Sequence, residues 1–85
     1  MEKRLGFVGI ILSDRKKSAE KVNKILSEYG EHIVARMGLP YSRRGCAVIT
    51  LIVDATTDEM GTLTGKLGAV AGVAVKSACA KTPKE

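Results

Sequence analysis

Aromatic, histidine and cysteine side chains are scarce in this 85-residue sequence. It contains no tryptophan, one phenylalanine, two tyrosines, one histidine and two cysteines. Proteins that bind single-stranded nucleic acid stack bases on aromatic rings, so this scarcity speaks against such a function. The lone histidine, His32, is far along the chain from both cysteines. No metal-ligand spacing results, and we predict neither a metal site nor a cofactor.

Long hydrophobic runs and catalytic signatures are also missing. No apolar run approaches the roughly 20 residues that cross a bilayer. The charged start over residues 1–4 leads directly into a strand-like run, unlike a secretory signal. We therefore expect a cytoplasmic protein with no membrane contact. The sequence has no nucleophile–base pair, no phosphate-binding glycine loop and no G-x-S-x-G segment. We predict that the protein is not an enzyme.

Positive charge exceeds negative charge. The chain has 14 Lys and Arg against 9 Asp and Glu, which gives a formal net charge of +5 and favours anionic partners. Lys16, Lys17, Lys21 and Lys24 share the polar face of a predicted helix. Solvation alone explains such a face, and the alternative is contact with an acidic partner or nucleic acid.

The spacing of hydrophobic residues alternates between strand-like and helix-like along the chain. Residues 5–13 and 47–53 are almost continuously apolar, which is typical of strands covered on both faces. The predicted elements, in order, are a strand over 5–13, a helix beginning near 15, strands over 33–41 and 47–53, a helix after 56 and a strand over 73–79.

Capping residues predict where the helices begin and end. Ser13 and Asp14 can cap the first helix, and Thr56 with Glu59 has the spacing of a capping box at the second. Gly30 and Gly72 stand where the two helices should stop, because glycine readily adopts the left-handed conformation.

This βαββαβ order predicts an α+β, ferredoxin-like sandwich with antiparallel strands ordered 4-1-3-2. The two strands that are apolar on both faces should be central. The alternating strands should be edges, and Pro40 in the second of the four strands agrees with that. We expect one domain over residues 1–80 and a polar tail over residues 81–85.

Right-handed crossovers place both helices on one face of the sheet and leave the other face bare. We predict that Arg36 and Lys76 point to the bare face and that Val48 and Ile52 make its centre apolar. Exposed aliphatic surface of a few hundred Å² forgoes several kcal/mol at ~25 cal/mol per Å². We therefore expect a second copy to cover this face in a homodimer or homotetramer. Ile33, Ala35, Met37, Val73 and Val75 should face the helices.

Two further expectations concern the ends of the sheet. Cys46 and Cys79 should lie at one end, about 10 Å apart across a central strand, which is too far for a disulfide. We expect two free thiols. We also expect Ser13, Asp14 and Arg15, at the end of the first strand, to lie near the start of the second helix.

Hydroxyl, carboxylate and guanidinium groups near helix N-termini can bind a small polar effector. We predict such a site at Ser13, Asp14 and Arg15, with Gly61 and Gly65 exposing the backbone of the second helix. Capping explains the first group equally well, and close helix packing explains the glycines.

Three segments resemble a known family. They are Arg-Met-Gly-Leu-Pro over 36–40, Gly-x-Leu-x-Gly-Lys-Leu-Gly over 61–68 and Gly-Val-Ala-Val-Lys over 72–76. They resemble proposed regulators of iron-only hydrogenase systems, which are similar to ACT domains and to the C-terminal domain of nickel-responsive repressors. The resemblance covers residues 3 to 77. It implies a ferredoxin-like fold, dimers or tetramers and a regulatory role, and it carries over no catalytic residues. The nickel-binding histidines of the repressors have no counterparts here.

We therefore expect a small, oligomeric, ACT-like regulatory module that binds a small effector and acts on a partner protein. Its expected self-association interface includes Arg36, Val48, Ile52 and Lys76. The alternative is a nucleic-acid-binding protein that uses Arg43, Arg44, Lys76 and the lysine-rich helix face. Residues 44–51 have the frame of an RNA-recognition strand, but Cys46, Val48 and Leu51 replace its aromatic rings.

Overall fold

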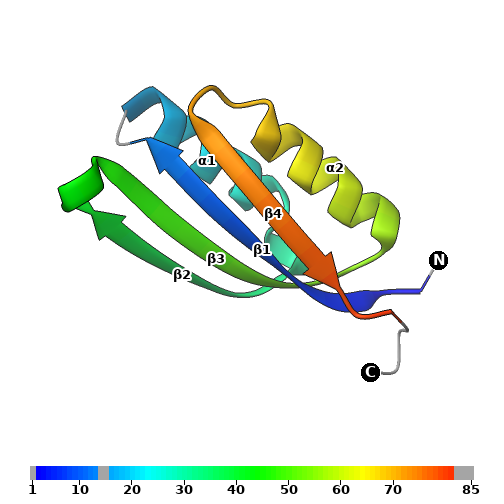
Figure 1. Cartoon of the computed structure of the whole chain (residues 1–85). Coiled ribbons are helices and arrows are strands. Elements are labelled where there is room, and N and C mark those ends of the chain that lie inside the picture. Colours follow the sequence, from blue (N-terminus) through cyan, green and yellow to red (C-terminus); the bar gives the residue numbers. More distant parts are fainter. Residues whose placement is uncertain (1, 14–15, 82–85) are drawn as a thin grey trace.

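The computed structural model describes residues 2–13 and 16–81 and is drawn in Figure 1. Its helices and strands follow the predicted order. In sequence they are β1 (Arg4–Ser13), α1 (Lys16–Glu28), the 3-10 turn η1 (Gly30–His32), β2 (Ile33–Tyr41), the 3-10 turn η2 (Ser42–Arg44), β3 (Cys46–Ala55), α2 (Thr57–Gly68) and β4 (Val73–Cys79).

The four strands form one antiparallel sheet in the order β2-β3-β1-β4. This is the predicted 4-1-3-2 order read from the opposite edge, so the α+β, ferredoxin-like prediction is confirmed. Both helices lie behind the sheet in the view of Figure 1, and the face toward the viewer is open. No helix within the described residues is long and apolar enough to cross a membrane.

The core lies between the sheet and the two helices. Alternate residues of β1, namely Val8, Ile10 and Leu12, are buried there, and β3 alternates in the same way. Both helices contribute the predicted apolar stripes, each buried residue stabilising the fold by about 1.5–3 kcal/mol. The buried hydrophobic residues are Val8, Ile10, Leu12, Val22, Leu26, Ile49, Leu51, Val53, Ala55, Met60, Leu63 and Leu67.

A β-bulge in β2 reverses the predicted orientation of most of that strand. Ile33 pairs with Val53, but Ala35 already pairs with Ile52, so Val34 is one extra residue. An extra residue switches every following side chain to the other face, because strand side chains alternate with a period of two. Ile33 contacts the core as predicted.

The prediction was wrong for the residues beyond the bulge. Ala35 and Met37 lie on the open face, where the exposed fraction of Met37 reaches 70%. Arg36 lies instead on the helix side, and one of its guanidinium nitrogens donates a hydrogen bond of 3.0 Å to Oδ1 of Asn23 on α1. The other edge strand follows the prediction: Val73 and Val75 contact the core.

The ends of the helices agree only in part with the prediction. The capping box of α2 is present, with a hydrogen bond of 3.1 Å from the Glu59 amide to Thr56 Oγ1 and one of 2.8 Å from the Thr56 amide to Glu59 Oε1. Gly30 has no positive φ and begins η1, so it does not stop α1 as predicted. Gly72 has a φ of 79° but lies beyond the end of α2, in the turn that enters β4.

Gly72 sits at a close approach between this turn and β1. Its carbonyl accepts a hydrogen bond of 3.0 Å from the Ser13 amide, and an added Cβ would lie 2.7 Å from Ser13 Oγ. Both the positive φ and the contact therefore favour glycine at this position.

We expect Gly72→Ala to lower the free energy of unfolding by about 1–2 kcal/mol, because alanine is strained at positive φ. Gly30→Ala is the matched control, since Gly30 has no positive φ and an added Cβ there meets nothing within 4 Å. It should change stability by less than about 1 kcal/mol and can be stabilising. Urea denaturation measures both. Equal losses in the two variants would contradict the assignment.

Candidate functional site

The open face of the sheet is the most distinctive surface of this protein. Eight large hydrophobic side chains are exposed among the described residues, and all except Val34 belong to this face. The exposed fraction of Phe7, on a central strand, is 59%. The seven residues are Leu5, Phe7 and Ile11 from β1, Met37, Leu39 and Tyr41 from β2, and Ile52 from β3.

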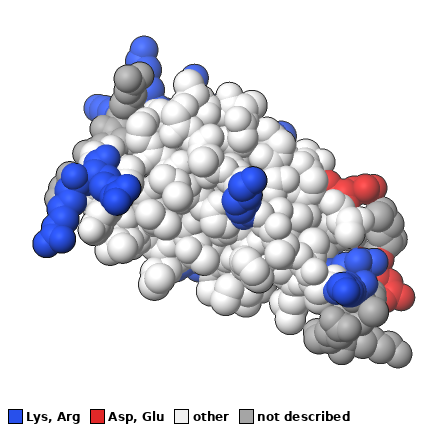
Figure 2. Space-filling model, viewed as in Figure 1, with Lys and Arg blue, Asp and Glu red and all other residues white. Residues whose placement is uncertain are grey.

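Charge is almost absent from the middle of this face. Figure 2 shows a wide uncharged surface with one basic side chain near its centre, and the other charges lie toward the ends. The register places Lys76 on this side, opposite Gly9 and beside Ala74 and Ala78. The half-buried Asp54, near one end of β3, has the opposite sign. Val48 and Ile52 lie here as predicted, whereas Arg36 does not.

Two hollows give the open face relief. One hollow of about 440 Å³ lies where β1 begins and β4 ends, and Leu5, Phe7, Ile52 and Cys79 border it. The second, of about 250 Å³, lies toward β2 between Met37, Thr50 and Ile52. The hollows are mostly apolar, so the face is suited to receive protruding apolar side chains.

The fold does not bring Ser13 close to the start of α2, as the predicted effector site required. Ser13 pairs with Cys46, while Arg4, at the other end of β1, pairs with Ala55, the residue before Thr56. The nine steps along the strand from Arg4 to Ser13 span about 30 Å. The expectation that Ser13 lies near the start of α2 was wrong. Because β1 and β3 are antiparallel, the end of β1 adjoins the start of β3, whereas α2 follows the end of β3. Asp14 and Arg15 lie outside the described residues.

The remaining predicted site residues have separate environments. The Ser13 hydroxyl is buried without a hydrogen-bond partner among the described residues, next to Gly72. Gly61 and Gly65 are exposed on α2, and an added Cβ at either meets no atom within 4 Å. Packing within one copy of the chain therefore does not explain these two glycines.

Both cysteines are free, as predicted, but their predicted placement was wrong. Cys46 pairs with Ser13 and Cys79 pairs with Gly6, so they lie seven residues of β1 apart, which is about 23 Å. The reason is that β3 and β4 both run antiparallel to β1 and hence parallel to one another. The start of β3 and the end of β4 therefore fall at opposite ends of the sheet.

His32 forms a polar junction with the start of α2 that the sequence reasoning missed. His32 is half-buried, and its Nε2 lies 3.2 Å from Glu59 Oε2. The Tyr29 ring lies 6.2 Å from the His32 ring, measured between the ring centroids. His32 thereby connects η1 to the capping box of α2. No group of three metal-ligating side chains occurs among the described residues.

The Glu59 carboxylate is stabilised in its charged form. The Thr56 amide is the main cause that lowers the pKa of Glu59 below its ordinary value of 4.5, with smaller contributions from the charges of His32 and Lys3. Because the folded pKa is the lower one, the carboxylate stabilises the fold fully above pH 4.5. That contribution is lost as the pH falls through the folded pKa.

We expect Glu59→Gln to flatten the decrease in stability between about pH 5 and pH 3, because glutamine keeps a capping oxygen but cannot titrate. The free energy of unfolding in urea, measured across that range, tests this. Glu20→Gln, on the exposed side of α1, controls for the loss of one negative charge. Parallel pH profiles for wild type and Glu59→Gln would contradict the role of Glu59.

Solved structures with the same architecture include a near relative. The uncharacterised protein TM1266 from Thermotoga maritima has a TM-score of 0.92 and 38% identity, covering 94% of this chain and 100% of that one. The ACT domain of GTP pyrophosphokinase from Chlorobium tepidum has a TM-score of 0.76 at 22% identity, covering 89% of this chain and 99% of that domain. The latter likeness shows the fold, which is therefore ACT-like.

The family assignment follows from sequence. A comparison with curated protein sequences gives no match. The model of the TM1266-like family, described as proposed iron-only hydrogenase system regulators, matches residues 4–77. This match extends from the start of β1 into β4 and agrees with the resemblance of the three glycine-containing segments. The chain belongs to the TM1266-like family of proposed iron-only hydrogenase system regulators.

Proposed function

We propose that this protein is a homo-oligomeric regulatory module that self-associates through the open face of its sheet. Its assembly state, together with a small effector, would control its contacts with a protein of an iron-only hydrogenase system. The family and the ACT-like fold support regulation rather than catalysis. The observation that carries the proposal is the exposed apolar surface of the sheet. Contact of this surface with water is unfavourable in free energy, so covering it with a second copy stabilises association.

The size of the open face suits a dimer. Four strands about 4.8 Å apart and ten residues of about 3.3 Å give a flat footprint of roughly 600 Å². A standard interface buries about 800 Å² of accessible surface on each partner, and a corrugated surface has more accessible area than its footprint. Covering a few hundred Å² of apolar area at ~25 cal/mol per Å² stabilises association by several kcal/mol.

The two charges on the face support pairing between identical copies. A two-fold interface brings the same surface of both copies together, so that surface must be complementary to itself in shape and charge. Lys76 and Asp54 carry opposite charges and lie at different heights along the sheet. A two-fold arrangement can therefore bring Lys76 of one copy to Asp54 of the other, which avoids an unpaired buried cation.

The nucleic-acid alternative has less support from the open face. Leu51, one of the positions that an RNA-recognition strand fills with an aromatic ring, is buried in the core. Lys76 is the only cation that the described register places on the middle of this face, and α1 with its lysines belongs to the opposite layer. Phosphate-dominated binding needs several cations along one surface. We propose a cytoplasmic location, where two free thiols persist.

We expect Ile52→Lys to shift the protein from dimer or tetramer to monomer, because it places a second cation at the centre of the apolar face. The Ile52 side chain is 47% exposed, so the substitution should leave the fold intact. Sedimentation equilibrium between about 1 and 100 µM, a range that resolves micromolar dissociation constants, measures the change.

Thr62→Lys is the matched control for this experiment. Thr62 is exposed on α2, on the other layer, and the substitution adds the same charge. It should leave the oligomeric state unchanged. A wild-type protein that is monomeric throughout the concentration range, or equal effects of the two substitutions, would refute self-association through the open face.

A further inference from the structure

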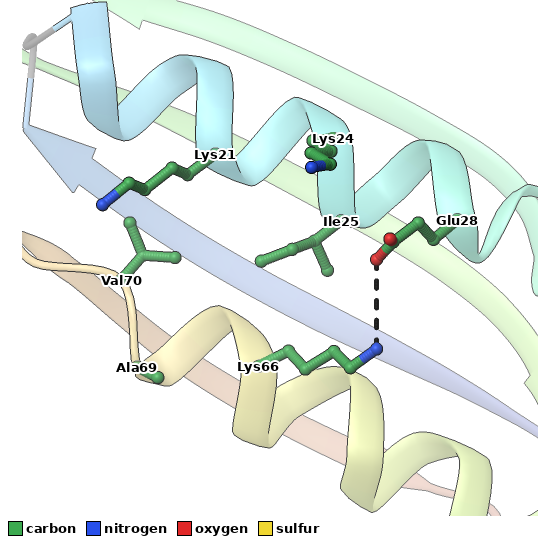
Figure 3. A pocket seen from close by; sticks show the side chains of 7 residues that line it. All are labelled: Lys21, Lys24, Ile25, Glu28, Lys66, Ala69 and Val70. Atoms are coloured by element: carbon green, nitrogen blue, oxygen red, sulfur yellow. Dashed lines mark ion pairs between the residues drawn. The ribbon is translucent and has the colours of Figure 1, made fainter.

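We propose that the groove between α1 and α2 binds a small molecule with one anionic group and an apolar body. This inter-helix groove, shown in Figure 3, lies on the helix layer, opposite the open face of the sheet. It rests on the proposed function and deepens it, since it gives the regulatory module a ligand site built from described residues. It differs from the predicted effector site in every residue.

The floor of the groove is apolar. The hollow measures about 390 Å³, within the range of about 300–1,000 Å³ that is typical of ligand pockets. Ile25 of α1 points toward α2 in Figure 3, and Val70 lies across from it with Ala69 at the end of α2. Ile25 and Val70 also contact the protein core, so this floor is held in place by the fold.

Lysines from both helices surround this floor. Lys21 and Lys24 come from α1, and Lys66 comes from α2. The one acidic residue that lines the hollow is Glu28, whose Oε1 lies 3.9 Å from Lys66 Nζ. Lys66 Nζ also lies 5.3 Å from the centre of the Tyr29 ring. Lys66 is therefore partly neutralised, and the net charge around the groove is positive.

Two lysines of the groove belong to α1: Lys21 reaches toward Val70 at one end, and Lys24 lies about one turn further along the helix. No carboxylate of the described residues forms an ion pair with Lys21 or Lys24. A smaller hollow of about 170 Å³ adjoins this end, shares Lys21 and Val70, and adds Lys17. An anionic group fits at this end, while the apolar part of the same molecule covers Ile25 and Val70.

A small molecule is favoured over a protein segment by the shape of the site. The residues that line the hollow span about two turns of α1 and the end of α2, so its apolar floor is short. Peptide helices bind in grooves through anchors at several successive turns. The groove also stays accessible when two open faces pair, because the helices and the open face are on opposite sides of the sheet.

Hexyl phosphate is a suitable probe, because it combines one phosphate with a short apolar chain. Titration of the 15N-labelled full chain should shift the amide signals of Ile25, Ala69 and Val70 saturably. Inorganic phosphate alone should bind at least about tenfold more weakly, since it cannot cover the apolar floor. Binding of hexyl phosphate should weaken as salt rises, because exposed charges are screened.

Lys21→Gln and Lys16→Gln form a matched pair, because both residues are exposed on α1 and each change lowers the formal net charge from +5 to +4. Lys16 does not line the groove. The dissociation constant at the Ala69 and Val70 amides should rise about three- to fivefold in Lys21→Gln and less than about twofold in Lys16→Gln.

Three results would overturn the proposal. They are no saturable shift at Ala69 and Val70 with hexyl phosphate, equal weakening by the two lysine substitutions, or saturable binding of an acidic peptide at these amides without any binding of hexyl phosphate. Ile52→Lys should bind hexyl phosphate as the wild type does, because its substitution is on the other layer. Failure of groove binding and failure of self-association are therefore distinguished.

Discussion

The structure depends on the fact that two helices can cover only one side of a sheet whose central strands are apolar on both. Val8, Ile10 and Leu51 point to the helices and lose all contact with water. Phe7 and Ile52, their neighbours along the same strands, point to the opposite side and remain about half exposed. The core and the exposed surface therefore come from the same two strands, and burial of one implies exposure of the other.

The bulge at Val34 enlarges that exposed surface. It directs Met37 and Leu39 outward, so a third strand adds large apolar side chains to the open face. The same shift brings Arg36 to the helix side, where it bonds to Asn23 and joins the edge of the sheet to α1. Bulges on edge strands commonly redirect side chains near functional surfaces. Here one extra residue determines that the open face is apolar as far as β2.

The two proposed surfaces have different chemistry and lie on opposite layers. The open face is apolar with little charge, which suits a second copy of the chain. The inter-helix groove has lysines around a short apolar floor, which suits a small anion. Ile25 and Val70 contact the core on one side and the groove on the other. A ligand in the groove would therefore contact two residues that also pack against the core between the helices and the sheet.

Local sequence determined most of the fold, because hydrophobic periodicity and the Thr56–Glu59 spacing act within a few residues. It therefore predicted both α-helices, all four strands, the strand order and an apolar open face. Tertiary pairing decided the rest. Antiparallel registers placed Cys46 and Cys79 at opposite ends, and Ser13 far from α2's start. The Val34 bulge and the groove between α1 and α2 arise only when distant segments meet, so no local pattern encodes them.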